Sequence, residues 1–177
     1  MPCSFFNIQK KLFFLFILNL NILVVIHSAN GQSNYNQDAL EYYTKGLEHA
    51  KKGDYYKAID DFTKAIELDY YLIQAYFNRG WAFSMISDYD KAIDDYTKAI
   101  ELDYYFKQAY FNRGWTFSMI GDYDKAIDDF TKAIELDSNY AKAYSARGWV
   151  FYMIGDIYRA NADRETALRI DPSILLN

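Results

Sequence analysis

Residues 110–136 read YFNRGWTFSMIGDYDKAIDDFTKAIEL, and their pattern predicts the basic unit of this fold. Four residues of the first half recur at i, i+3, i+4 and i+7, the spacing of one helical face: Tyr110, Arg113, Gly114 and Phe117. Gly121 and Asp122 should end this helix, because glycine readily adopts the left-handed turn conformation and aspartate caps a following helix. A second helix is expected from about Tyr123 to Leu136, where apolar residues again follow helical spacing. The stretch therefore predicts a helix-turn-helix unit.

The unit recurs every 34 residues without insertion. Four blocks fill most of the chain: 39–72, 73–106, 107–140 and 141–174. The second and third blocks are identical at 27 of 34 positions. Self-similarity at a fixed period of this size indicates a stacked repeat array. The sequence therefore predicts four consecutive helix pairs.

The pattern resembles the tetratricopeptide repeat, whose signature positions hold aromatic residues, a glycine and two alanines in this order. The small residue of the first helix is Gly46, Gly80, Gly114 and Gly148. The alanines of the second helix are Ala58, Ala92, Ala126 and Ala160, followed by Ala65, Ala99, Ala133 and Ala167. The resemblance implies an all-α, right-handed α-solenoid whose concave surface is lined by the first helix of each repeat.

One departure from this family concerns charge inside the repeat. The family usually has leucine three residues after the first aromatic, but this chain has Lys45, Arg79, Arg113 and Arg147. A buried arginine at such a position requires a carboxylate partner. Aspartate pairs on the second helices are the candidates: Asp60–Asp61, Asp94–Asp95 and Asp128–Asp129. We expect these groups to have a structural role.

A second departure lies in the last block. Arg164 replaces the aromatic residue that the other blocks have at this position, namely Phe62, Tyr96 and Phe130. In the family this position packs against the next repeat, and terminal repeats require a polar outer face. Such a face is expected from Asn161, Asp163, Arg164 and Glu165. The array is therefore expected to finish at four repeats.

The resemblance also assigns a set of side chains to the concave groove: Phe77, Trp81, Met85, Phe111, Trp115, Met119, Lys142, Trp149, Tyr152 and Met153. The three tryptophans recur every 34 residues and would form a ladder along the groove. Tryptophan is the residue type most enriched at binding hot spots, which favours a role in binding. Aromatic residues at helical spacing also pack against one another, so packing is the alternative for the ladder.

Some members of the family bind the C-terminal carboxylate of chaperones through a clamp of Lys, Asn and Arg side chains. Asn112 and Lys142 match part of this clamp, whereas Ala146 replaces its arginine. Because the clamp is incomplete, this resemblance does not predict a chaperone as the partner.

Composition argues against nucleic-acid binding and catalysis. The net charge is -5, whereas nucleic-acid binding depends on Lys and Arg that neutralise phosphates. The single cysteine is Cys3, and His49 is expected to be a lone surface histidine. The acidic runs lack the glycine and glutamate spacing of a calcium loop, and no glycine-rich phosphate loop occurs. We expect no enzymatic activity, no cofactor and no metal.

The first 29 residues have the order of a secretory signal peptide. Lys10 and Lys11 precede an apolar stretch, residues 12–26, and small and polar residues follow. The alternative is a retained membrane anchor over 12–26, although a spanning helix needs about 20 apolar residues. Residues 30–38 would join this leader to the array. The sequence predicts export to a secreted or periplasmic location, with membrane attachment only if the apolar stretch is retained.

These features predict a non-enzymatic protein-interaction scaffold whose concave groove binds a peptide segment or helix of a partner protein. The alternative is a structural, self-associating envelope protein. In that case the aromatic ladder would serve packing or oligomerisation.

Overall fold

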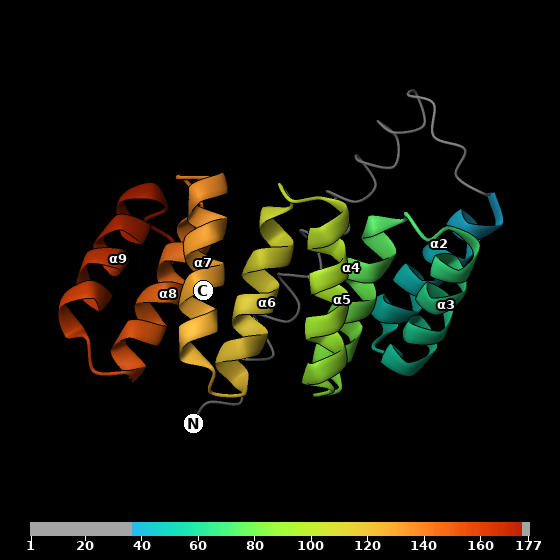
Figure 1. Cartoon of the computed structure of the whole chain (residues 1–177), viewed down its shortest axis with the longest axis horizontal. Helices are drawn as coiled ribbons and strands as arrows, with labels where there is room; N and C mark the ends of the chain where they lie inside the picture. Colours follow the sequence, from blue (N-terminus) through green and yellow to red (C-terminus); the bar gives the residue numbers. More distant parts are fainter. Residues whose placement is uncertain (1–36, 175–177) are drawn as a thin grey trace.

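The computed structural model describes residues 37–174. Over this range the chain forms eight α-helices and no strand. The helices are α2 (Gln37–Lys52), α3 (Tyr55–Leu68), α4 (Ile73–Met85), α5 (Tyr89–Leu102), α6 (Lys107–Met119), α7 (Tyr123–Leu136), α8 (Ala141–Met153) and α9 (Ile157–Ile170). Successive helix pairs lie side by side in chain order, from α2 and α3 at one end to α8 and α9 at the other (Figure 1). The predicted all-α solenoid of helix pairs is confirmed.

The turn inside the third pair forms as the sequence predicts. Gly121 has a φ of 82°, in the left-handed region that glycine adopts without steric cost. The N–H of Asp122 donates to the carbonyl of Phe117 at 3.0 Å, which satisfies a carbonyl at the end of α6. The carboxylate of Asp122 in turn accepts from the N–H of Lys125, in the first turn of α7. One dipeptide therefore ends one helix and begins the next.

Small residues allow the two helices of a repeat to approach closely. The signature alanines of α3, α5 and α7 are fully buried. A Cβ placed on Gly114 of α6 would lie 3.0 Å from the Cβ of Asp129 and 3.2 Å from the carbonyl oxygen of Ala126, both in α7. These separations are shorter than ordinary van der Waals contacts, so a methyl group here would require α7 to move away by a few tenths of an ångström.

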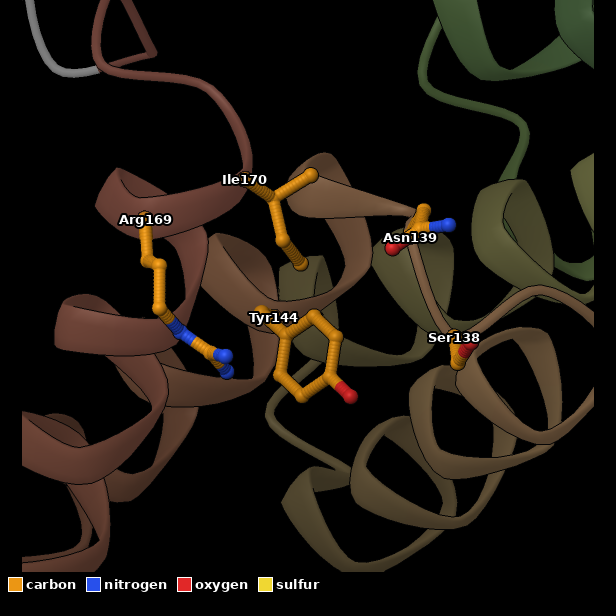
Figure 2. A pocket seen from close by; sticks show the side chains of 5 residues that line it. All are labelled: Ser138, Asn139, Tyr144, Arg169 and Ile170. Carbon is orange, nitrogen blue, oxygen red and sulfur yellow. The ribbon is translucent and has the colours of Figure 1, made fainter.

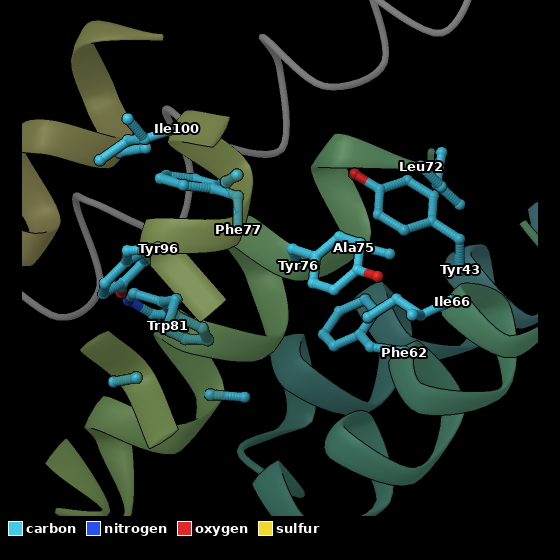
Figure 3. Close-up of a cluster of buried hydrophobic side chains, with 14 of the residues drawn as sticks. Tyr43, Phe62, Ile66, Leu72, Ala75, Tyr76, Phe77, Trp81, Tyr96 and Ile100 are labelled. Carbon is cyan, nitrogen blue, oxygen red and sulfur yellow. The ribbon is translucent and has the colours of Figure 1, made fainter. Parts of the chain in front are cut away.

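Aromatic rings fill the space between successive repeats. Phe62, Tyr96 and Phe130, the aromatic residues of the second helices, are at most 1% exposed. The largest buried cluster contains Tyr43, Phe62 and Tyr96, which Figure 3 labels. This cluster extends as far as Ala143 in the fourth repeat. A smaller cluster around Phe130 and Val150 joins the third repeat to the fourth. The hydrophobic core therefore runs along the array and joins each helix pair to the next.

The expected arginine–carboxylate contacts are present in three repeats. Arg79 pairs with Asp95 and Arg113 with Asp129, as predicted. Arg147 pairs with Asp163 at 2.8 Å, and Asp163 is buried. The prediction that Asp163 belongs to the polar outer face is therefore wrong, because this carboxylate is used inside its own repeat. The other three predicted members of that face are exposed: Asn161, Arg164 and Glu165.

The first repeat satisfies its charges differently. Lys45, which occupies the arginine position, pairs with Glu41 on its own helix at 2.6 Å. The carboxylate of Asp61 instead accepts from the Nδ1–H of His49 at 2.7 Å. The prediction that His49 is a lone surface histidine is wrong. Because Lys45 pairs with Glu41, it does not pair with Asp61, and the imidazole of His49 pairs with that carboxylate instead.

None of the helices within residues 37–174 is long and apolar enough to cross a membrane. The predicted signal peptide or anchor and most of the segment 30–38 lie outside the described residues.

Candidate peptide-binding face

The ten predicted groove residues all lie on α4, α6 and α8, the first helices of the second, third and fourth repeats. Neighbouring first helices contact one another along the array. The tryptophan occupies the same position in each of these helices, because the repeat length is constant. The structure thus brings the predicted residues to one succession of helices, but it exposes them to different degrees.

The part of this set on α4 is buried. Phe77 packs between Tyr96 and Phe106, with ring centroids 5.8 Å and 4.8 Å away. Trp81 is 6% exposed and lies edge-on against Tyr55, at 5.6 Å between ring centroids. Both rings therefore contribute to the packing of the second repeat.

The part on α6 and α8 is open. Trp115 is 39% exposed and Trp149 is 42% exposed. Their rings lie 5.9 Å apart between centroids, with 40° between the ring planes, which is within the range of favourable aromatic pairs. Three further exposed residues follow them on the same two helices: Met119, Tyr152 and Met153. We call these five residues the open aromatic face.

Two residues between these regions are partly buried. Phe111 packs between Phe130 and Tyr140, at centroid distances of 5.6 Å and 5.3 Å. Met85, at the end of α4, packs against the large buried cluster. Both side chains therefore belong to the packing between helices rather than to the open aromatic face.

Two isoleucines that the sequence did not predict lie at the edge of this face. Ile120 and Ile154 are the C-caps of α6 and α8, and both are exposed beside Met119 and Met153. The shared ending Met-Ile of the two helices was the available signal. These residues extend the exposed apolar surface to the turns.

Polar residues of the first helices are partly used inside the array. The amide of Asn78 donates to the hydroxyl of Tyr43 in the preceding repeat at 2.9 Å. Partial burial lowers the pKa of the Lys142 ammonium, and the carboxylate of Asp171 opposes this shift. Across residues 37–174, no group of three or more His, Cys, Asp and Glu side chains could hold a metal ion. The chemistry of the face is therefore dominated by its aromatic rings and thioethers.

Comparison with known proteins identifies the repeat. The family model described as "Tetratricopeptide repeat" matches residues 39–69, 73–103 and 108–140, which together exceed half of the chain. A comparison of the sequence with curated proteins found no match.

Solved structures of similar fold include three informative examples. A crystal structure of MamA is 25% identical, with a TM-score of 0.74 over 80% of this chain and 84% of that chain. The first TPR of Spaghetti (RPAP3), bound to the HSP90 peptide SRMEEVD, is 26% identical, with a TM-score of 0.66 over 69% of this chain and 98% of that one. The second TPR domain of human RPAP3, in complex with the HSP70 peptide SGPTIEEVD, is 26% identical, with a TM-score of 0.64 over 66% and 98%.

Proposed function

This chain belongs to the tetratricopeptide repeat family, and on that premise we propose that it is a non-enzymatic scaffold that binds a peptide segment or helix of a partner protein. The open aromatic face of α6 and α8 is the proposed contact surface. Its partner lies against Trp115 and Trp149, with Met119, Tyr152 and Met153 around them.

The observation that carries this proposal is the exposure of two contacting tryptophans. Transferring a whole aromatic side chain from water is worth at most about 4–6 kcal/mol, since it covers 150–250 Å². About two-fifths of each indole is exposed. Covering that part would contribute roughly 2 kcal/mol per ring by the same area relation. Exposed apolar surface of this kind is typical of interaction sites.

The nature of the partner is supported by the similar structures. Two tetratricopeptide domains of RPAP3 hold short peptides, one from HSP90 and one from HSP70. An amphipathic helix or an extended segment with large apolar residues is the type of ligand that a groove of stacked helices can take. Thioethers of methionine adapt to irregular apolar partners, which suits Met119 and Met153 to this role.

The proposal is tested by selecting random twelve-residue peptides on the purified chain and measuring the selected peptides by calorimetry. The test variant is Trp115→Ala/Trp149→Ala. The matched control is Tyr71→Ala/Tyr105→Ala, which removes two aromatic rings that are even more exposed but lie in the turns between repeats. Circular dichroism verifies that both variants are folded.

We expect the tryptophan variant to weaken binding at least a hundredfold, about 2.7 kcal/mol, and the tyrosine variant to change it less than threefold. An equal loss of peptide affinity in both variants would show that the open aromatic face is not the binding site. If the wild-type chain selects no peptide but its mass by light scattering rises with concentration and the tryptophan variant stays monomeric, the face is a self-association surface instead.

A further inference from the structure

The first two junctions between repeats are closed by a tyrosine from the turn. At the second junction, between the second and third repeats, Tyr104 lies edge-on against Tyr110. The ring centroids are 6.2 Å apart, and the angle between the ring planes is 87°. The ammonium of Lys132 lies 4.7 Å from the centre of the Tyr104 ring. Glu135 holds that lysine through an ion pair at 3.1 Å.

The first junction repeats this arrangement with the residues 34 positions earlier. The ring centroids of Tyr70 and Tyr76 lie 6.1 Å apart, with 83° between the ring planes. The ammonium of Lys98 lies 4.8 Å from the centroid of the Tyr70 ring. Glu101 pairs with Lys98 at 3.0 Å. The inner rings, Tyr76 and Tyr110, are only 5% and 6% exposed. At each of these two junctions, the inner tyrosine is therefore covered by a turn tyrosine, which contacts a lysine that is paired with a glutamate.

The third junction keeps the inner ring but lacks its cover. Ser138 replaces the turn tyrosine, Thr166 replaces the lysine, and Arg169 replaces the glutamate. The inner ring, Tyr144, is consequently more exposed than its two counterparts. A hollow of about 700 Å³ opens there, lined by Ser138, Asn139, Tyr144, Arg169 and Ile170. Figure 2 shows Tyr144 in the middle of this set, between Arg169 on one side and Ser138 and Asn139 on the other.

The charge at one position that lines the hollow, Arg169, is also reversed. Arg169 places a guanidinium where the two preceding repeats have the carboxylates of Glu101 and Glu135. The fourth repeat carries five basic side chains against four acidic ones, whereas the chain as a whole has a net charge of -5. The basic residues are Lys142, Arg147, Arg159, Arg164 and Arg169, and the acidic ones are Asp156, Asp163, Glu165 and Asp171. An anionic group is therefore favoured next to the hollow.

We propose that this hollow binds an aromatic side chain of a partner polypeptide, with a neighbouring carboxylate of that polypeptide on Arg169. The aromatic ring takes the place against Tyr144 that Tyr104 has against Tyr110. The preferred ring geometry is edge-on, and a guanidinium can both pair with the carboxylate and lie over the ring.

This site is separate from the open aromatic face. Tyr144 and Trp149 are five residues apart on α8, which turns their side chains about 140° from one another around the helix axis. A partner could therefore occupy the hollow without contact to the tryptophans. The inference does not depend on the function proposed above.

The sequence of the second junction supplies a probe peptide, and its two tyrosines can be replaced to give a control peptide. The probe is the peptide acetyl-ELDYY-amide, which copies residues 101–105, and its matched control is acetyl-ELDAA-amide. The filled variant is Ser138→Tyr/Thr166→Lys/Arg169→Glu, which gives the third junction the cover of the second. Arg169→Gln removes only the charge. Binding to the full chain is followed by NMR titration to millimolar peptide, with the backbone amides of Asn139 and Tyr144 as reporters.

We expect the probe to shift both reporters and the alanine peptide to bind at least tenfold more weakly. The filled variant should lose binding at least tenfold while its unfolding midpoint equals or exceeds that of the wild type. Arg169→Gln should weaken binding and reduce its dependence on salt. Trp115→Ala/Trp149→Ala should leave it unchanged, so failure of either proposal is distinguishable from failure of the other.

The proposal is overturned if the probe shifts neither reporter, or if the filled variant binds as tightly as the wild type. It is also overturned if binding appears only after removal of residues 175–177, because the hollow would then belong to the chain's own terminus.

Discussion

Arg113 holds Asp129 with both ends of its guanidinium. Its Nε and Nη2 donate to the two carboxylate oxygens of Asp129 at 2.8 Å each. Its Nη1 donates to the hydroxyl of Thr97, in the preceding repeat, at 2.9 Å. One side chain therefore joins the two helices of its own repeat and also contacts the repeat before it. Arg79 and Arg147 make the same three contacts in the neighbouring repeats.

Removing the carboxylate alone should destabilise the array. Asp129→Ala leaves the guanidinium of Arg113, whose side chain is 18% exposed, without its partner. We expect a loss of about 3 kcal/mol, the lower end of the range for a broken buried pair. The double variant Arg113→Leu/Asp129→Ala should be less destabilised than Asp129→Ala, because no unpaired charge remains.

Urea unfolding followed by circular dichroism measures both variants. Thr97→Val serves as the control, since it removes one neutral acceptor and should cost about 1 kcal/mol. A double variant that is less stable than Asp129→Ala would contradict this, because Arg113 would then stabilise the array without Asp129, through its contact with Thr97 and its own packing.

The stability of the wild type should depend on the titration of Asp129 with a defined sign. Burial raises the pKa of this carboxyl, and Arg113 only partly opposes the shift. A carboxyl with a higher pKa in the folded chain binds its proton more tightly when folded. Its contribution therefore favours folding at acid pH and is lost as the pH rises through the folded pKa. Unfolded Asp titrates near about 3.9.

The variant Asp129→Asn cannot titrate at this position. The difference in unfolding free energy between wild type and variant should therefore decrease as the pH rises from about 3.5 to 7. Urea titrations across that range measure the difference. An increase with pH would mean that the arginine dominates and that the pKa of Asp129 is lowered.

Ser87 is the one non-glycine residue with a positive φ in residues 37–174, at 64°. The equivalent turns in the other three repeats have Gly53, Gly121 and Gly155, with φ of 82–83°. Ser87→Gly should stabilise the chain by about 0.5–1 kcal/mol, because the left-handed conformation is costly for a residue with a Cβ. Gly121→Ser is the reciprocal control and should destabilise by a similar amount. The unfolding midpoints of the two variants would contradict this account if they moved in the same direction.

The three tryptophans should differ in their contribution to stability. Trp81→Ala removes a buried ring and should cost about 3–5 kcal/mol. Trp115→Ala removes a ring that is partly in water and should cost about 1 kcal/mol. Thermal unfolding of the two single variants measures the difference, and equal losses would show that Trp115 is as deeply packed as Trp81.

The repeat and the helices of this chain were predictable without a structure, and so was the turn at Gly121 and Asp122. Period, helical spacing and the Gly-Asp dipeptide are local signals, because the backbone conformation of a turn depends on the residues in it. The bounds of α7 agree with the residues predicted from one block. The arginine–aspartate contacts of the second and third repeats were likewise predictable, since both partners recur with the repeat.

Which copies of a repeated residue are buried depends on tertiary packing. Trp81 and Trp115 occur in nearly the same phrase, yet one lies against Tyr55 and the other is open. His49 is hydrogen-bonded to Asp61, and the buried Asp163 pairs with Arg147. The hollow beside Tyr144 likewise appears only when Ser138 and Arg169 come together from different helix pairs. A local sequence fixes the direction of a side chain, but its burial depends on the neighbouring repeat that the fold places against it.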